Sequence, residues 1–149
     1  MINTTSILND LIETLKDGHE GFRAAAGDVQ SSDLKTLFLE WSLQRGRFVG
    51  ELQALAQSLG ESDPEDSGSV AGAVHRGWIN LKAALTSKDD HAILAECERG
   101  EDVAVARYEK AINEEGLPAN VRTTLSAQFV EVKAAHDRVR NLRDSLAVK

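Results

Sequence analysis

Cysteine, proline and aromatic residues are scarce in this sequence. Its 149 residues include one cysteine, Cys97, two prolines and seven aromatic residues, namely two Trp, one Tyr and four Phe. A single cysteine excludes an intrachain disulfide and a cysteine-cluster metal site, and it fits a reducing compartment. The plentiful alanine, leucine, glutamate, lysine and arginine favour helices.

An excess of basic charge and long apolar runs are also missing. The chain has 17 Lys and Arg against 24 Asp and Glu, a formal net charge of −7. Proteins that bind nucleic acid usually present a basic face to the phosphates, so we expect no nucleic-acid partner. No apolar run approaches the roughly 18 residues that span a bilayer, so we expect no membrane segment. The first residues, MINTTSILNDLIETLKDG, lack a basic stretch followed by an apolar core. We therefore expect a cytoplasmic protein without a signal peptide.

Helical periodicity is the main positive feature of the sequence. Apolar residues recur at three- and four-residue steps over four long segments, about 5–27, 32–59, 90–115 and 118–147. Each segment has one apolar face, which must be buried against the others. We therefore predict a single all-α domain over residues 1–149, with a four-helix bundle as its core.

The connections between these segments predict the topology. The first and last connections are short, which makes the helices that they join antiparallel neighbours. The middle connection, from Gly60 to Asp89, is long and contains its own predicted helix at about 70–86. At 1.5 Å per residue such a helix spans roughly 24 Å, enough to carry the chain along most of the bundle. The second and third long helices would then run parallel, as in ferritin-like bundles. The alternative is a five-helix up-down bundle.

Polar residues on the four helices suggest a metal centre. Ferritin-like bundles hold metal ions among carboxylates and histidines at one level of the core. Counting residues from one end of the predicted bundle brings several candidates to within about one turn of one level. The candidate ligands are Glu20, Glu98, Glu101 and His136, with His19 or Glu40 completing the set. Oxygen and imidazole ligands would favour iron or manganese.

The Glu-x-x-His pattern of such centres is incomplete. Glu40 is followed three residues later by Leu43, and His136 is preceded by Lys133 where a carboxylate is needed. The alternative is that the acidic residues form salt bridges with nearby arginines such as Arg45.

Two further groups have a structural and a functional interpretation. Glu51, Tyr108 and Gln128 fall within about a turn of one another, which predicts a buried hydrogen-bonded layer, with a ligand site as the alternative. In the crossover, His75, Arg76 and Trp78 either anchor the crossover helix or form an interaction surface.

Two residues of the charge-dense run from Glu96 to Asp102 have a predicted structural role. Gly100 lies inside a predicted helix, where glycine costs about 1 kcal/mol against alanine, so it marks close packing, with the crossover helix as a candidate neighbour. Cys97 lies on the apolar face of the same helix and is expected to be buried.

Three segments resemble a known family. They are Leu8–Gly18, Gly68–Trp78 and Glu96–Asp102. The family is an uncharacterised bacterial group of ferritin-like four-helix-bundle proteins, assigned to a domain of unknown function. The resemblance covers nearly the whole chain and implies a bacterial, cytoplasmic protein associated with stress-related genes. It implies no established activity or substrate.

We therefore expect a non-enzymatic helical bundle of unknown role that acts through self-association or partner binding, as a small homo-oligomer. The alternative is a degenerate ferritin-like protein that binds iron or manganese.

Overall fold

The computed structural model describes residues 3–60, 78 and 80–147. This part of the chain contains helices and no strand, so the predicted all-α class is confirmed. Its helices are α1 Thr4–Asp28, α2 Ser32–Ser58, α4 Leu81–Ser87, α5 Asp90–Ile112 and α6 Ala119–Ala147. None of these helices is long and apolar enough to cross a membrane.

Side chains in the connections determine where the helices begin. Asn3 accepts the Ser6 amide at 2.9 Å before α1, Ser31 accepts the Leu34 amide at 3.3 Å before α2, and Asp89 accepts the His91 amide at 3.0 Å before α5. Such N-caps satisfy amides that have no partner within the helix.

One predicted helix end is displaced. Helix α5 ends at Ile112, three residues before the predicted end at 115. The Arg122 guanidinium donates to the backbone oxygens of Ile112 and Glu114, each at 2.9 Å. These bonds supply partners for carbonyls at the end of α5 and tie it to the start of α6.

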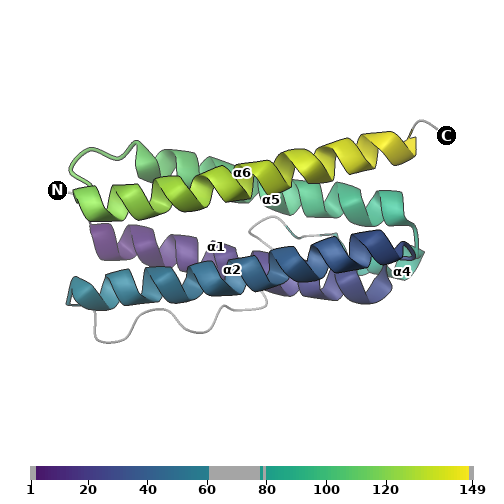
Figure 1. Cartoon of the computed structure of the whole chain (residues 1–149), viewed down its shortest axis with the longest axis horizontal. Coiled ribbons are helices and arrows are strands. Elements are labelled where there is room, and N and C mark those ends of the chain that lie inside the picture. The colour runs from purple at the N-terminus through teal and green to yellow at the C-terminus, as the bar shows by residue number, and fades with distance from the viewer. Residues whose placement is uncertain (1–2, 61–77, 79, 148–149) are drawn as a thin grey trace.

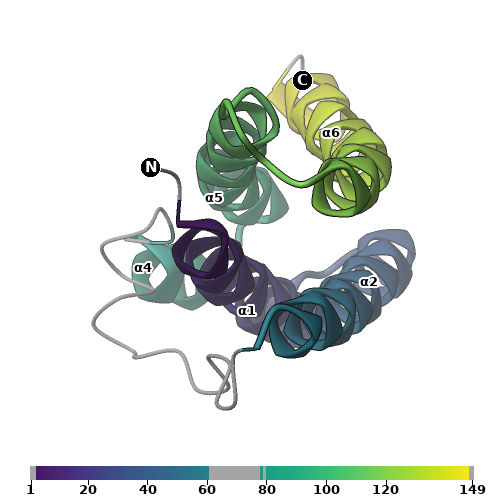
Figure 2. The same ribbon diagram turned by 90° about the vertical axis from the view of Figure 1, so that its left-hand side faces the viewer.

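The helices form two antiparallel pairs, α1 with α2 and α5 with α6 (Figure 1). Helix α1 packs against α5, whereas α2 and α6 touch only sparsely (Figure 2). The Gln30 and Ser31 amides donate to the Asp90 carboxylate at 2.7 and 3.0 Å, which holds the starts of α2 and α5 together. These two helices therefore run in the same direction, as the long connection predicted.

The predicted crossover helix at 70–86 requires a correction. Residues 61–77 and 79 lie outside the described residues, and Trp78 is not helical. Helix α4 begins only at Leu81, and the preceding Asn80 amide donates to the Glu96 carboxylate at 2.8 Å. A side chain of α5 therefore holds the chain just before α4, and the helix is not continuous through this point.

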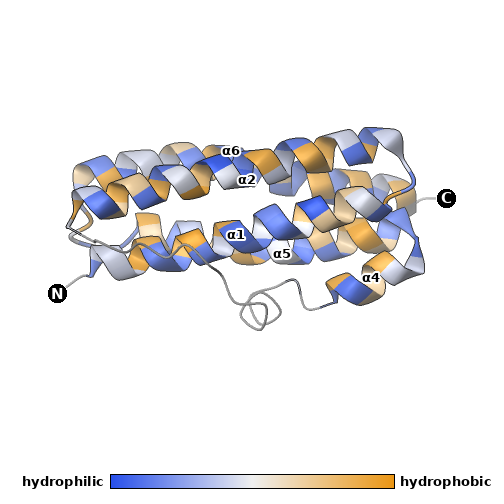
Figure 3. Ribbon diagram, turned by 90° about the horizontal axis from the view of Figure 1, so that it is seen from below, coloured by the Kyte–Doolittle hydropathy of each residue, from blue (hydrophilic) through white to orange (hydrophobic). Residues whose placement is uncertain are grey.

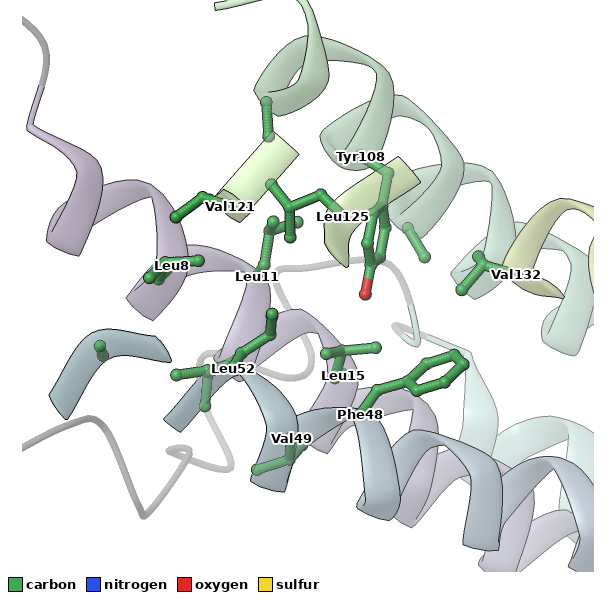
Figure 4. Close-up of a cluster of buried hydrophobic side chains, with 14 of the residues drawn as sticks. Leu8, Leu11, Leu15, Phe48, Val49, Leu52, Tyr108, Val121, Leu125 and Val132 are labelled. Carbon is green, nitrogen blue, oxygen red and sulfur yellow. The ribbon is translucent and has the colours of Figure 1, made fainter. Parts of the chain in front are cut away.

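The core consists of two apolar clusters along the bundle axis. Figure 4 shows the first, in which Leu11, Leu52 and Leu125 come from three different helices. The second is centred on Phe22, Phe38 and Trp78. Each helix carries both hydrophobic and hydrophilic residues (Figure 3).

Candidate functional site

A buried ion pair lies between the two apolar clusters. The Arg45 guanidinium on α2 donates to both oxygens of Glu101 on α5, at 2.6 and 2.5 Å. Both side chains are only 1% exposed. Arg45 also lies 5.4 Å from the Phe22 ring centre and packs beside Gly18 of α1. A bidentate pair of this kind is strong and geometrically specific.

This ion pair corrects the predicted metal centre. Both carboxylate oxygens of Glu101 already accept hydrogen bonds, and the guanidinium puts a positive charge where an ion would lie. A second cation beside it would be repelled in a medium of low dielectric. The core residues therefore do not fit a ferritin-type metal centre.

Two of the other predicted ligands do not face the core. Glu20 and Glu40 are exposed. Leu43, which takes the place of the second ligand after Glu40, is 71% exposed, so a histidine there would also point outward. His19 contacts Ser42, with Nδ1 at 2.7 Å from the backbone oxygen. Counting residues along the helices did not predict that Glu20 and Glu40 point outward.

The predicted buried hydrogen-bonded layer is confirmed for Tyr108 and Gln128, whereas Glu51, its third member, is exposed. Tyr108 donates to Gln128 at 2.8 Å, and the Gln128 amide donates to Glu51 at 2.8 Å. Burial raises the pKa of Tyr108 well above its ordinary value. The tyrosine therefore stays protonated and acts as a hydrogen-bond donor.

The structure does bring two of the predicted ligands together at the α5–α6 edge. One ligand atom each of Glu98, Asp102 and His136 lies within 4.8 Å of the others. His136 is only 8% exposed. Its Nε2 lies 2.6 Å from Asp102, and its Nδ1 lies 3.0 Å from Asp137. Glu98 is paired with Arg143.

Hydrogen bonds shift the pKa values of His136 and of its neighbour Asp137. Burial by itself lowers the pKa of His136, but the bonds to Asp137 and Asp102 outweigh it and raise the pKa. The hydrogen bond from Lys133 and, as the next contribution, the one from His136 lower the pKa of Asp137 to about 2. Asp137 is therefore a carboxylate near neutral pH and a good acceptor for the imidazole.

The sequence interpretation missed Asp102 and Asp137. Asp102 lies four residues after Glu98, so both share one face of α5, and this spacing could have identified it. Asp137 directly follows His136 in sequence. Adjacent helical residues do not normally face each other, so no periodic signal indicates that contact.

The predicted interaction surface in the crossover is also corrected. Trp78 is only 5% exposed, and its ring packs at right angles to that of Phe22, 5.4 Å away. An indole in this position is not available to a partner. His75 and Arg76 lie outside the described residues.

The Trp78 ring fits between two helix-interior glycines. A Cβ atom at Gly21 of α1 would lie 2.6 Å from the ring, and one at Gly100 of α5 would lie 2.2 Å from it. The expectation that Gly100 marks close packing is confirmed, and the neighbour is a crossover residue. Trp78 thus ties the crossover to α1 and α5.

The α2–α6 side carries the exposed apolar residues of the described chain. The large exposed side chains are Leu39 and Leu43 on α2, Leu59 directly after α2, and Val130 on α6. A groove also runs between the two helices. It is lined by Glu51, Ala54, Leu55, Ser58, Thr123, Thr124 and Ala127. Exposed apolar side chains and a groove therefore occur together on this side of the bundle.

Residues 3–114 match the family described as a domain of unknown function, DUF2383. The chain belongs to this family. The DUF2383 match includes Arg45, Trp78 and Glu101, but it ends before α6 and so excludes His136. The DUF2383 description assigns no activity. A comparison with curated proteins finds no match.

Proposed function

We propose that this protein is a non-enzymatic helical bundle that acts by pairing with a second copy of itself through the outer face of α2. The observation that carries the proposal is the stripe formed on that face by Leu39, Leu43, Gly50 and Ala54, all partly or fully exposed. We also propose ferritin-like connectivity, which the parallel course of α2 and α5 supports. The family resemblance supports a bacterial, cytoplasmic protein linked to stress-related genes.

The interior supports a role at the surface. The Arg45–Glu101 pair and the Tyr108–Gln128 bond occupy polar positions that a ligand would need. Because these groups already satisfy one another, chemistry in the core would first have to break buried interactions. Contacts made by the surface carry no such cost.

The shape of the α2 stripe favours a second copy as the partner. Leu39 and Leu43 are one turn apart, as are Gly50 and Ala54, and all four fall on one helical face. A two-fold axis near Arg47 would run two copies of α2 antiparallel. Leu43 of each copy would then meet Gly50 of the other, and Leu39 would meet Ala54. A Cβ at Gly50 meets no atom within 4 Å, so this position is open to a partner side chain.

Burial of these leucines would stabilise the pair. Leu43 is 71% exposed and Leu39 is 44% exposed. Burying a leucine fully contributes about 1.5–3 kcal/mol, and a two-fold interface repeats each contact. Leucines that stay in water gain none of this free energy, so their burial favours association.

Sedimentation velocity over a wide concentration range tests the proposal. We expect a monomer–dimer equilibrium in the unmodified chain, and a shift to monomer in L43E because a charge would replace the central apolar contact. V130E is the matched control, since Val130 is 66% exposed but lies on α6. A chain that stays monomeric at every concentration, or a dimer that L43E leaves intact, would refute the proposal.

A further inference from the structure

We propose that Glu98, Asp102 and His136 form a binding site for a divalent transition-metal ion at the edge between α5 and α6. The site differs from the core centre expected from the sequence, because it uses neither Glu101 nor Glu20. It also does not depend on the proposed self-association, since all three residues lie on α5 and α6.

The ligand atoms are close to the arrangement that one ion needs. They already lie within 4.8 Å of one another. Bonds from such an ion to oxygen and nitrogen are about 2.0–2.2 Å, so two ligand atoms on one ion are at most about 4.4 Å apart. Glu98 and Asp102 are one turn apart on α5 and approach His136 from the same helix face. Small side-chain rotations would complete the geometry, and Asp102, which is 61% exposed, has room for them.

The imidazole is held as a metal-ligating histidine is usually held. In metal sites, the second ring nitrogen commonly donates to a carboxylate outside the ligand set, which sets the tautomer and the ring orientation. Here Nδ1 of His136 lies 3.0 Å from Asp137, so Nε2 points at Asp102. Lys133 holds Asp137 in turn, with distances of 2.8 and 3.1 Å to its two oxygens. This support from outside the ligand set distinguishes the group from a surface patch of acidic residues.

Binding would displace two present interactions. An ion would take the place of the Arg143 guanidinium on Glu98. It would also replace the proton between Nε2 of His136 and Asp102, and that proton would pass to solvent. Arg143 would not lose every partner, because it also donates to Asp144 at 3.0 Å from Nε and 2.8 Å from Nη2. Arg143 is thus a competitor of the ion.

The ligand chemistry selects the class of ion. One imidazole with two carboxylates suits Zn²⁺, Mn²⁺, Fe²⁺ or Co²⁺, whereas Ca²⁺ and Mg²⁺ prefer oxygen alone. The exposure of Asp102 leaves that side open to solvent, so water can complete the coordination.

Titration of the full-length chain with Zn²⁺ and Co²⁺, after chelator treatment and desalting, tests the proposal. Calorimetry should show one saturable Zn²⁺ site per chain, and Co²⁺ should develop visible absorption bands. We expect H136Q and D102N each to weaken binding by about 10–100-fold, as loss of a ligand or its support does in metal sites. H91Q is the matched control, since His91 lies on α5 outside the cluster, and it should bind as the unmodified chain does.

A fourth variant separates a metal site from a network of ion pairs. R143Q removes the competitor, so it should bind Zn²⁺ more tightly, whereas a cluster that serves only as salt bridges would gain no affinity. Circular dichroism checks that each variant is folded. The proposal is overturned if the unmodified chain shows no saturable binding, if H91Q weakens binding as much as H136Q, or if R143Q binds no tighter.

Discussion

Replacing Gly100 by alanine should destabilise the protein when Trp78 is present and stabilise it when Trp78 is absent. In the unmodified protein the new Cβ would lie 2.2 Å from the indole Cε2 and 2.5 Å from Nε1. The ring cannot withdraw easily, because it also lies against Gly21 and packs edge-on to Phe22. G100A should therefore strain the contact between the crossover and α5.

The two opposing effects can be estimated separately. Overpacking of this kind costs about 1–3 kcal/mol, and the closeness of the contact favours the upper end. Alanine gains about 1 kcal/mol over glycine inside a helix. We expect G100A to destabilise the protein by about 2 kcal/mol as the net of these terms. W78A should cost about 3–5 kcal/mol, but in its background G100A should stabilise the protein by about 1 kcal/mol.

Urea unfolding followed by circular dichroism measures the four proteins of this double-mutant cycle. The expected coupling between the two positions is about 3 kcal/mol, equal to the strain that the indole causes. G27A is the control, since no atom lies within 4 Å of a Cβ placed at Gly27 of α1, and it should not destabilise the protein. If G100A has the same effect with and without Trp78, the indole is not what requires glycine at this position.

Three further predictions concern buried polar and ionisable groups. Removing one partner of the ion pair, as in R45M, should destabilise the protein by about 3–5 kcal/mol because Glu101 stays buried, whereas R45M combined with E101L should recover most of the loss in the same unfolding assay. Burial raises the pKa of Glu96 above its ordinary value of 4.5, although the Asn80 amide and Arg99 partly oppose this. The folded state therefore binds the proton more tightly, so stability should fall as pH rises from 4.5 through the folded pKa, and E96Q should remove that part of the pH dependence of unfolding. Burial likewise raises the pKa of the Cys97 thiol, whose side chain is fully buried. A thiol reagent should therefore label the native protein only at the rate of unfolding. Labelling as fast as in urea would contradict this.

The sequence predicts where much of the candidate site lies along the bundle axis, but not the direction in which its side chains point. Counting along each helix correctly placed Glu98 and His136 at one level, because the rise per residue is constant. It could not show that Glu20 and Glu40 point outward, since a small difference in helix rotation about its axis moves a side chain from the core to the surface. Nor could it choose Arg45 as the partner of Glu101 from several arginines of similar height.

The sequence alone determined the all-α class, the approximate helix bounds and the long middle connection, because periodicity and capping residues act over a few neighbouring positions. Counting residues also indicated that Tyr108 and Gln128 lie at one level, where buried polar groups would need partners. Only the tertiary structure decided that Trp78 is enclosed by Gly21 and Gly100, that Arg45 and Glu101 pair inside the core, and that Asp102 joins His136 at the edge. These contacts join residues far apart in the sequence, and their geometry depends on how the helices rotate and pack against one another.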